Sequence, residues 1–447
     1  MQKEILLKPR VQILITLIFL VLTPSMNYFL MTHNPSQNRL FMGDPDYLDN
    51  GNILVCGGDL FDTFRVLERI NEDQQYIPKE ERTNFVMEIT RDGERVWAAR
   101  GLDFPHEAIK LPNGDILVAD TLNDRVVRYN YPNHFIVWKW RVDDINWEDV
   151  NPEWDQDHYY NNNNGSFDWS HLNDIDIHHY EEGWDGLLIS IRNFDLIVEL
   201  NYTAAQEHFP RASDIVWWYG DYQNHTMLNH QHNPDYLSNG NIIVADSENH
   251  RIIEINKTTK EIVWSYNGTS NGNTQSDQEC LKWCRDVNEV PESIEGDFLI
   301  SDIDRIFMID KQTKQVVWEF EDEILQAYTT EIDEERGNLL VDCSFLGKII
   351  EVDIESKEII WQFGKSLLKQ MLFFDCSMFM AFFGFRYAII QLKFSKVKKT
   401  EMKHPNRSRY FQYLCGGMIV FLALLMIFHL EILRWVLYRL VSTHDIG

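Results

Sequence analysis

Three histidines and one arginine occupy matching positions in separate segments that share one sequence pattern. His106 and His232 each lie seven residues before an Asn-Gly dipeptide, and an aliphatic run follows each dipeptide. His171 occupies the corresponding place in a third segment, and Arg285 in a fourth. If the segments pack around a common axis, these side chains converge on one small volume.

A group of imidazoles beside a guanidinium suits more than one kind of chemistry. Imidazole can attack an electrophilic centre, protonate a leaving oxygen or donate a hydrogen bond. Arginine offers a two-pronged donor to sulfate or phosphate oxygens. Three histidines could equally bind a metal such as zinc, or they could only hydrogen-bond the turns of neighbouring sheets. Spacing alone leaves these alternatives open.

A second repeated pattern, Asp-x-x-Asn-x-Arg, follows the aliphatic run. Such a corner lets side chains satisfy the backbone of a tight turn. We therefore predict a structural role for its six members, Asp120, Asn123, Arg125, Asp246, Asn249 and Arg251. In the third segment the corresponding residues are Ser190, Arg192 and Asn193, so the arginine precedes the asparagine by one residue. We predict that this shift aims Arg192 toward the histidines.

These residues belong to a unit of four expected β-strands that recurs along the chain. Short strands separated by tight turns are typical of antiparallel sheets, and one such sheet cannot bury both faces alone. Each copy ends in Val-Trp or Ile-Trp, which supplies a large apolar anchor for the outer strand. The copies cover 46–98, 106–141, 171–219, 226–266, 285–320 and 325–363. Six four-stranded sheets predict an all-β fold, a six-bladed β-propeller over residues 36–364.

Charge and cysteine content narrow the possible partners. The 447-residue chain has a formal net charge of −28, which argues against nucleic acid or an anionic membrane surface as a partner. Its six cysteines are too few and too scattered for a disulfide framework. Cys280 and Cys284 lie four residues apart, and the sequence does not decide whether they pair.

Both ends of the chain contain apolar stretches. Residues 11–31 are uncharged, long enough to span a bilayer, and preceded by basic residues. We predict that region 1–35 is a cytoplasmic tip with a retained transmembrane anchor, with a cleaved signal peptide as the alternative. The propeller would then face the exterior, in agreement with several Asn-x-Ser/Thr glycosylation triplets in 164–269.

The C-terminal region 365–447 is expected to form a membrane hairpin. Residues 371–392 and 413–433 are apolar, and the basic run 393–409 lies between them. Two spans place that run in the cytoplasm, as the positive-inside tendency requires. The chain is thus predicted to be a multi-pass cell-membrane protein. The alternative makes 371–392 a membrane-surface or packed helix.

One insertion between the second and third units stands out by composition. Residues 143–169 are acidic, aromatic and rich in asparagine. Long loops between propeller blades cap one face of the fold, so a lid is one interpretation and a solvated loop is another.

The His-led segments resemble the arylsulfotransferase family, particularly its membrane-anchored archaeal-type branch. The resemblance lies in HEAIKLPNGDILVAD, DWSHLNDIDIHHYEEGWDGLLISIRNFD, QHNPDYLSNGNIIVADSENHRIIEI and LKWCRDVNEV, and it covers about 100–320 well. It implies a six-bladed propeller that transfers a sulfuryl group from a phenolic sulfate ester to a phenol acceptor. The transfer would need no nucleotide donor, cofactor or metal.

The resemblance also implies roles for individual residues. His232 is similar to the nucleophile that is transiently sulfated, and His171 and His106 to its oxyanion-binding and acid/base partners. Arg192 would clamp the sulfuryl oxygens, and Asn173 and Arg285 would bind substrate. The fourth segment departs from the family pattern, because Cys284 precedes Arg285 where a proline is expected.

Two other functions are compatible with the sequence. A non-catalytic, exterior-facing propeller could bind a glycan, a peptide or a membrane partner through the acidic insertion. A metal or quinone site in the ring of histidines is a weaker possibility. The sequence does not indicate the donor, the acceptor or the oligomeric state.

Overall fold

The computed structural model describes the residues from the first blade to the sixth, with gaps. These residues are 39–40, 43–59, 85–154, 158–159, 168–268, 281–324, 327–344 and 347–364, and all belong to one compact unit. The predicted membrane segments 11–31, 371–392 and 413–433 lie outside them. Within the described ranges, no helix is both long and apolar enough to cross a membrane.

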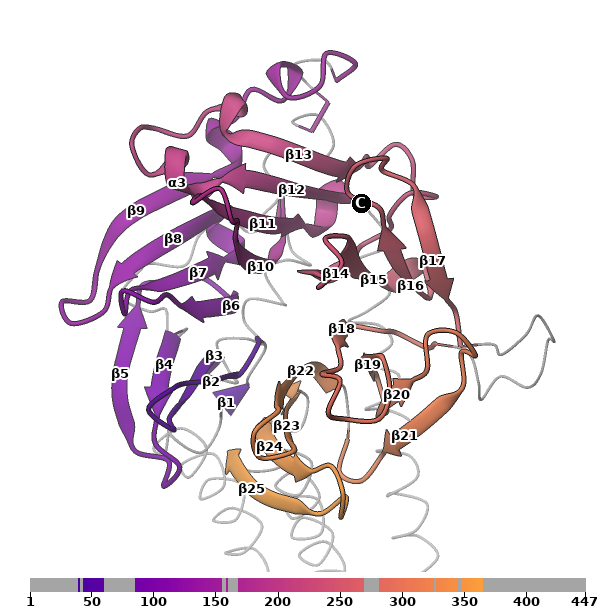
Figure 1. Ribbon diagram of the computed structural model, residues 1–447. Helices are drawn as coiled ribbons and strands as arrows, with labels where there is room; N and C mark the ends of the chain where they lie inside the picture. Colours follow the sequence, from indigo (N-terminus) through magenta and orange to yellow (C-terminus); the bar gives the residue numbers. More distant parts are fainter. Residues whose placement is uncertain are drawn as a thin grey trace, which may run out of the picture. The chain divides into compact units, whose positions relative to one another are not determined.

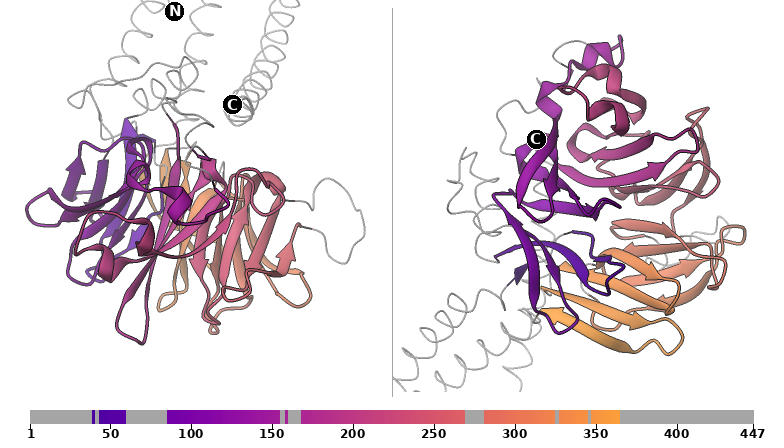
Figure 2. Two further views of the ribbon diagram at one scale, coloured as in Figure 1. Left: turned by 90° about the horizontal axis from the view of Figure 1, so that it is seen from above. Right: turned by 60° about the vertical axis from the view of Figure 1, so that its left-hand side comes forward.

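The fold is an all-β, six-bladed propeller, as predicted. Six antiparallel sheets surround a common centre, and the first strand of each sheet lies nearest to it (Figures 1 and 2). Blade 1 consists of β2 (Asp46–Tyr47), β3 (Ile53–Asp59), β4 (Phe85–Ile89) and β5 (Arg95–Arg100), with β1 (Arg39–Leu40) paired to β3. Blade 2 consists of β6 (Pro105–Lys110), β7 (Ile116–Asp120), β8 (Arg125–Asn130) and β9 (Phe135–Arg141).

The remaining blades repeat this order from the centre outward. Blade 3 consists of β10 (Leu172–His179), β11 (Asp185–Ile191), β12 (Leu196–Asn201) and β13 (Ile215–Gly220). Blade 4 consists of β14 (His232–Tyr236), β15 (Ile242–Asp246), β16 (Arg251–Ile255) and β17 (Ile262–Tyr266). Blade 5 consists of β18 (Asp286–Glu289), β19 (Phe298–Asp302), β20 (Arg305–Ile309) and β21 (Val316–Phe320). Blade 6 consists of β22 (Ala327–Asp333), β23 (Asn338–Cys343), β24 (Lys348–Asp353) and β25 (Ile359–Gly364).

The few helical turns are short. The helix α3 (Tyr202–Ala205) follows blade 3's third strand, and its N-cap Asn201 accepts a hydrogen bond from the amide of Ala204. Single 3-10 turns connect the second and third strands of blades 2, 3 and 4, at Thr121–Asn123, Arg192–Phe194 and Ser247–Asn249. These turns place polar side chains beside the first strands of the same blades.

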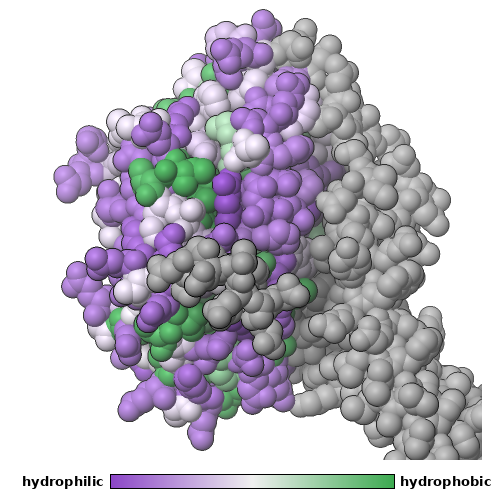
Figure 3. Space-filling model, turned by 90° about the vertical axis from the view of Figure 1, so that its right-hand side faces the viewer, coloured by the Kyte–Doolittle hydropathy of each residue, from purple (hydrophilic) through white to green (hydrophobic). Residues whose placement is uncertain are grey.

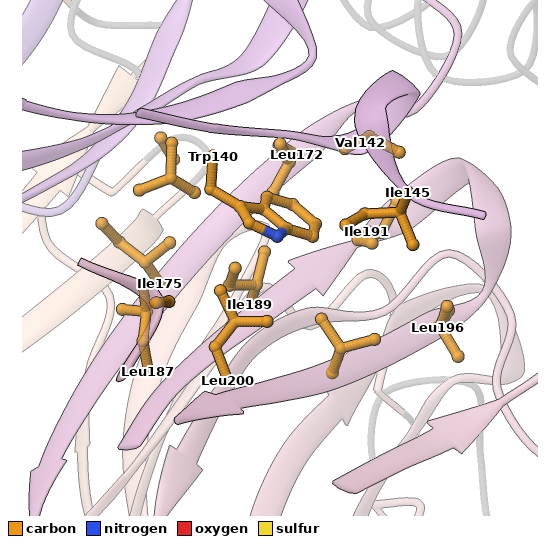
Figure 4. Packing of buried hydrophobic residues seen from close by; sticks show 14 of the residues in the cluster. Trp140, Val142, Ile145, Leu172, Ile175, Leu187, Ile189, Ile191, Leu196 and Leu200 are labelled. Carbon is orange, nitrogen blue, oxygen red and sulfur yellow. The ribbon is translucent and has the colours of Figure 1, made fainter. Parts of the chain in front are cut away.

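Apolar residues of neighbouring sheets pack face to face between the blades. One large cluster joins blades 2 and 3, where Trp140 lies fully buried against Leu172, Ile175 and Ile189 (Figure 4). The exterior face in Figure 3 is mostly hydrophilic with small hydrophobic patches. The core therefore lies between sheets, which is why one blade cannot be stable by itself.

The tryptophan that ends each repeat is more than an apolar anchor. In every blade its indole N–H donates a hydrogen bond to a backbone carbonyl of the next blade. The six pairs are Trp97 with Tyr131, Trp138 with Ala205, Trp217 with Lys257, Trp264 with Lys311, Trp318 with Ile354, and Trp361 with Arg91. The same contact thus connects all six blades in turn, including the sixth to the first.

Blade 6 and blade 1 close the ring through polar contacts. Besides the tryptophan contact, the Arg91 guanidinium lies 2.6 Å from the carboxylate of Glu351, which is almost fully buried. The Thr329 hydroxyl donates to the carbonyl of Gly43 over 3.2 Å. Closure therefore depends on hydrogen bonds between residues nearly 300 positions apart.

The described part of the 143–169 insertion is not a solvated loop. Trp147, Trp154 and Tyr159 are each 1% exposed and belong to the core cluster of blades 2 and 3. Tyr159 stacks on Phe194 with ring centroids 4.2 Å apart. The insertion therefore supports the turn that begins with Arg192.

Of the two cysteines in question, only one is described. Cys284 is buried and free, whereas Cys280 lies outside the described residues. Burial raises the pKa of the Cys284 thiol well above its usual value. This thiol is consequently unreactive at neutral pH.

Candidate functional site

The predicted residues enter the centre of the propeller at the starts of the first strands. His106 is the second residue of β6, His232 is the first residue of β14, and His171 immediately precedes β10. Arg285 immediately precedes β18, and Tyr328 is the second residue of β22. All five are at most 7% exposed. Five blades thus contribute one side chain each to a buried polar centre.

A shared backbone irregularity orients these side chains. The pairing register shifts between Pro105 and Glu107 in blade 2 and between His232 and Asp235 in blade 4. Blade 3 shifts directly after His171, and blade 6 shifts between Ala327 and Thr330. A β-bulge bends the strand and redirects a side chain. The bulges explain how the first strands of blades 2, 3, 4 and 6 can direct a residue to the same place. In blade 5, β18 pairs with β19 without a register shift, and Arg285 lies directly before the strand.

The rings lie close enough to act on one ligand. The ring centroids of His106 and His171 are 5.0 Å apart. The Tyr328 ring lies 5.8 Å from that of His106 and 5.9 Å from that of His232. Nη1 of Arg285 lies 2.6 Å from Nε2 of His232. These spacings fit a single small ligand.

Each histidine is held through its Nδ1 atom. In His106, Nδ1 lies 3.0 Å from the Phe104 carbonyl and 2.8 Å from the Thr121 hydroxyl. In His232 the equivalent contacts are 3.0 Å to the His230 carbonyl and 2.9 Å to the Ser247 hydroxyl. A carbonyl oxygen can only accept, so we assign the proton to Nδ1 in both rings.

His171 has a different partner. Its Nδ1 lies 2.7 Å from Oδ2 of Asp168, a buried residue at the end of the insertion. A carboxylate also accepts, so His171 too carries its proton on Nδ1. In all three neutral rings, Nε2 is then the unprotonated atom.

Electrostatics keep the three rings neutral. Burial lowers the pKa of each ring well below the usual value. The nearby charges of Arg192 and Arg285 lower the pKa of His171 and His232 further. Neutral imidazole is the nucleophilic form, and Nε2 of His232 is unprotonated at neutral pH, although in this structure it accepts a hydrogen bond from Nη1 of Arg285.

Two guanidinium groups are buried at this centre. Arg192 and Arg285 are each 3% exposed, and burial lowers the pKa of Arg285 to about 9. Arg192 donates to Oδ1 of Asn193 over 2.8 Å, and the guanidinium of Arg285 lies over the Trp283 ring. Within the described ranges, no carboxylate pairs with either arginine. A buried cation is costly without a counter-charge, so the site favours an anionic ligand.

Asn173 supports the strand that begins with His232. Its Nδ2 donates to the carbonyl of Gln231 over 2.8 Å, directly before His232. This bond joins blades 3 and 4. One of the two amide hydrogens of Asn173 is therefore used within the protein.

The Asp-x-x-Asn-x-Arg corners are structural, as predicted. Asp120 accepts hydrogen bonds from Asn123 and Arg125. Asp246 accepts them from Asn249 and Arg251. Each aspartate also accepts a backbone N–H from the segment that leads into the first strand. The corners thus position the residues just before His106 and His232.

Tyr328 and Asp168 were not predicted. Asp168 opens the quoted motif of the third unit, but nothing in the sequence placed its side chain against His171 instead of in solvent. Tyr328 lies in the sixth unit, whose first turn lacks the Asn-Gly dipeptide that aligned His106 with His232. The sequence feature that could have identified Tyr328 is an aromatic residue at the start of an expected first strand.

A second unpredicted feature is a group of buried and half-buried carboxyl groups on or beside the first strands. Burial is the main cause that raises the pKa of Asp46 to about 7, and of Asp176 and Asp286 to about 6. The group also includes Asp44, Glu107, Asp174, Asp235 and Glu331, whose pKa values are raised in the same direction. Through the part of the chain that the structure describes, no three His, Cys, Asp or Glu residues are arranged to hold a metal ion.

Comparisons with known proteins bear on the fold. Residues 235–254 match the NHL repeat. No curated protein matches the chain. Among solved structures, a catalytically inactive virginiamycin B lyase from Staphylococcus aureus with quinupristin is similar at 10% identity, over 73% of this chain and 85% of that chain, with a TM-score of 0.42.

Two further structures are similar at the same level. A streptogramin B lyase has 10% identity over 74% of this chain and 84% of that chain, with a TM-score of 0.41. A protein of unknown function from Bacteroides caccae has 14% identity over 73% of this chain and 81% of that chain, with a TM-score of 0.33.

Proposed function

We propose that this protein is an arylsulfotransferase-like enzyme that transfers a sulfuryl group from a phenolic sulfate ester to a phenol. The observation that carries the proposal is the pair of buried arginines without a carboxylate partner, beside three histidines whose Nε2 atoms are unprotonated. Guanidinium groups bind the oxygens of tetrahedral anions. A neutral imidazole in such a site is a nucleophile toward the bound group.

The transfer has two half-reactions. Nε2 of His232 attacks the sulfur atom, the nitrogen–sulfur bond forms, and the bond from sulfur to the donor's aryl oxygen breaks. The donor leaves as a phenolate and takes up a proton from solvent, and solvent regains a proton when His106 later releases the one it accepts from the acceptor. In the second half-reaction the acceptor phenol loses its proton, its oxygen attacks the sulfur, and His232 is released as the neutral imidazole.

The neighbouring residues have distinct roles in this scheme. Arg192 and Arg285 stabilise the negative charge on the sulfuryl oxygens, which is largest in the transition state. His106 accepts the proton of the incoming phenol through its bare Nε2. His171, held by Asp168, is a second proton acceptor through its unprotonated Nε2. Fixed donors in a dry site stabilise charge more strongly than water does.

The location of the enzyme follows from the sequence. Anchoring by 11–31 and by the hairpin of 371–392 and 413–433 would place the propeller outside the cell. Its donor and acceptor would then be small phenolic compounds on the exterior side. The high negative charge of the chain disfavours anionic polymers as substrates.

Purified full-length protein tests the function directly. With 4-nitrophenyl sulfate as donor and phenol as acceptor, we expect release of 4-nitrophenol that increases with acceptor concentration. The variant His232→Ala should reduce release to background, because the nucleophile is lost. His179→Ala, which changes a largely exposed histidine, should leave the rate unchanged.

Other outcomes would favour a different function. No release by the parent protein, together with unchanged binding of a glycan or peptide by His232→Ala, would favour the non-catalytic propeller.

A further inference from the structure

Tyr328 is a buried tyrosine whose hydroxyl group has no partner in the structure. Its residue exposure is 3%, and among the described residues its oxygen makes no hydrogen bond. A buried hydroxyl normally finds a partner, because a buried polar group without one loses its hydrogen bonds to water and gains none in return. An unsatisfied hydroxyl inside a polar centre therefore points to a missing ligand.

The backbone places Tyr328 in the sixth blade where other blades carry their histidines. It lies within the bulge between Ala327 and Thr330, as His106 lies within the bulge between Pro105 and Glu107. Its ring lies 5.8 Å from that of His106 and 5.9 Å from that of His232. Tyr328 is therefore the contribution of blade 6 to the same centre.

None of the histidines or arginines at the centre is a neutral hydrogen-bond donor toward a ligand. The hydroxyl of Tyr328 is such a donor. The Nε2 atoms of the three histidines are unprotonated, so they accept hydrogen bonds and do not donate them, and that of His232 lies 2.6 Å from Nη1 of Arg285. Both arginines donate, and their charges lie close enough to Tyr328 to lower its pKa. Burial outweighs them and raises the pKa above the usual value. The hydroxyl therefore keeps its proton at any physiological pH.

We propose that Tyr328 is an anion-binding residue whose hydroxyl donates a hydrogen bond to an oxygen of the sulfate or sulfuryl group held beside His106, His232 and the two arginines. The identity of the anion rests on the proposed function. Anion binding by Tyr328 rests on the geometry alone and can hold even if no transfer occurs. A neutral donor binds an oxygen without adding a third buried positive charge to the site.

Binding of inorganic sulfate to the full-length protein tests the proposal without requiring turnover. Isothermal titration calorimetry should show sulfate binding to the parent protein. We expect Tyr328→Phe to weaken that binding by about 10- to 100-fold, as the loss of one hydrogen bond to a charged group predicts. Sulfate should also raise the melting temperature of the parent protein more than that of the variant.

A matched control separates this effect from the removal of any buried hydroxyl. Tyr159 is 1% exposed, and its hydroxyl also lacks a described partner. Its ring contacts aromatic residues of the insertion, such as Trp147, together with Phe194 and Tyr222. Tyr159→Phe should bind sulfate as the parent does. Equal affinity of Tyr328→Phe and the parent would overturn the proposal, and so would a parent that binds no sulfate.

If Tyr328→Phe does not fold, a second pair of variants tests the same role. Tyr328→Gln keeps a neutral donor, whereas Tyr328→Met has a similar length and no strong donor. Sulfate should bind more tightly to the Gln variant, and equal affinities would refute the donor role. Normal sulfate binding without transfer to any phenol would contradict the proposed function and leave the role of Tyr328 intact.

Discussion

At the scale of single residues, the site depends on which nitrogen of each histidine carries the proton. Carbonyl oxygens hold Nδ1 of His106 and His232, and a carboxylate holds Nδ1 of His171. Burial and neighbouring arginines keep the rings uncharged. The result is a centre with unprotonated Nε2 atoms and fixed cationic donors. Such a centre is suited to attack on a bound anion.

Replacing the carboxylate partner of His171 tests its positioning role. Asp168→Asn keeps the shape of the side chain but can turn an amide N–H toward Nδ1 of His171, which would favour the wrong tautomer of the ring. We expect turnover in the sulfate-transfer assay to fall by roughly 10- to 1,000-fold, by analogy with the loss of a carboxylate behind a catalytic histidine. The pH profile of turnover should shift as well. Asp168→Glu should recover part of the rate, whereas an unchanged profile in the Asn variant would contradict the role.

At the scale of the elements, two repeated contacts hold each blade against the next. Each terminal tryptophan donates to the next blade, and buried glutamates bind basic residues of the next blade. Glu199 pairs with Lys257 and Glu254 with Lys311 at 2.7 Å and 2.5 Å. The same device joins the last blade to the first. Together these contacts fix how far each first strand reaches toward the centre.

The contact between blades 6 and 1 provides a stability test. Glu351→Ala removes a buried carboxylate that accepts hydrogen bonds from Tyr47, Arg91 and Asn338. We expect the free energy of unfolding to fall by about 3 kcal/mol, as for other broken buried pairs.

An exposed ion pair serves as the control. Lys282→Ala disrupts the pair with Asp304, in which both side chains are more than 40% exposed, and should cost less than about 1 kcal/mol. Chemical denaturation of both variants measures the difference. Equal losses would show that closure does not depend on Glu351.

At the scale of the whole molecule, ring closure gathers carboxyl groups from several blades into the interior. Burial and mutual repulsion raise the pKa of Asp46, Asp174 and Asp235 together. No described lysine or arginine forms an ion pair with them. These groups therefore retain protons in the folded protein at a pH where the unfolded chain has lost them.

Stability should consequently depend on pH in a defined direction. The folded pKa of Asp176 is about 6 and that of Asp46 about 7, both raised mainly by burial from a usual value of 3.8. The folded state binds more protons between these values, so stability is fully present below about pH 4 and is lost as pH rises toward 7. This contribution favours a higher melting temperature at pH 5 than at pH 8, whereas the three buried histidines, whose pKa values are lowered in the folded state, act in the opposite direction. The contribution is therefore measured as the difference between the parent and Asp176→Asn.

A substitution tests whether the interior carboxyl groups cause this pH dependence of stability. Asp176→Asn should flatten the pH dependence, because it removes one titrating group from the interior. The exposed variant Glu335→Gln should leave the dependence as it is. A melting temperature that rises from pH 5 to pH 8 in the parent, with no effect of Asp176→Asn, would contradict this interpretation.

The sequence by itself determined the architecture and part of the site. Alternating strands, turn dipeptides and the repeated tryptophan specify a blade, and six copies specify a closed propeller. Aligning the copies was enough to bring His106, His171, His232 and Arg285 together, because equivalent positions in a propeller surround one axis. The corners around Asp120 and its counterpart in blade 4 were predictable because their contacts are local.

Only the tertiary structure decided the features that depend on contacts between distant segments. The pairing of Asp168 with His171 requires the insertion to fold back on the third blade. Tyr328 reaches the site through a β-bulge that the sequence pattern of the sixth unit does not predict. The pKa values of the interior carboxyl groups depend on closure, because a carboxyl group loses its water and meets its neighbours only when all six sheets are in place.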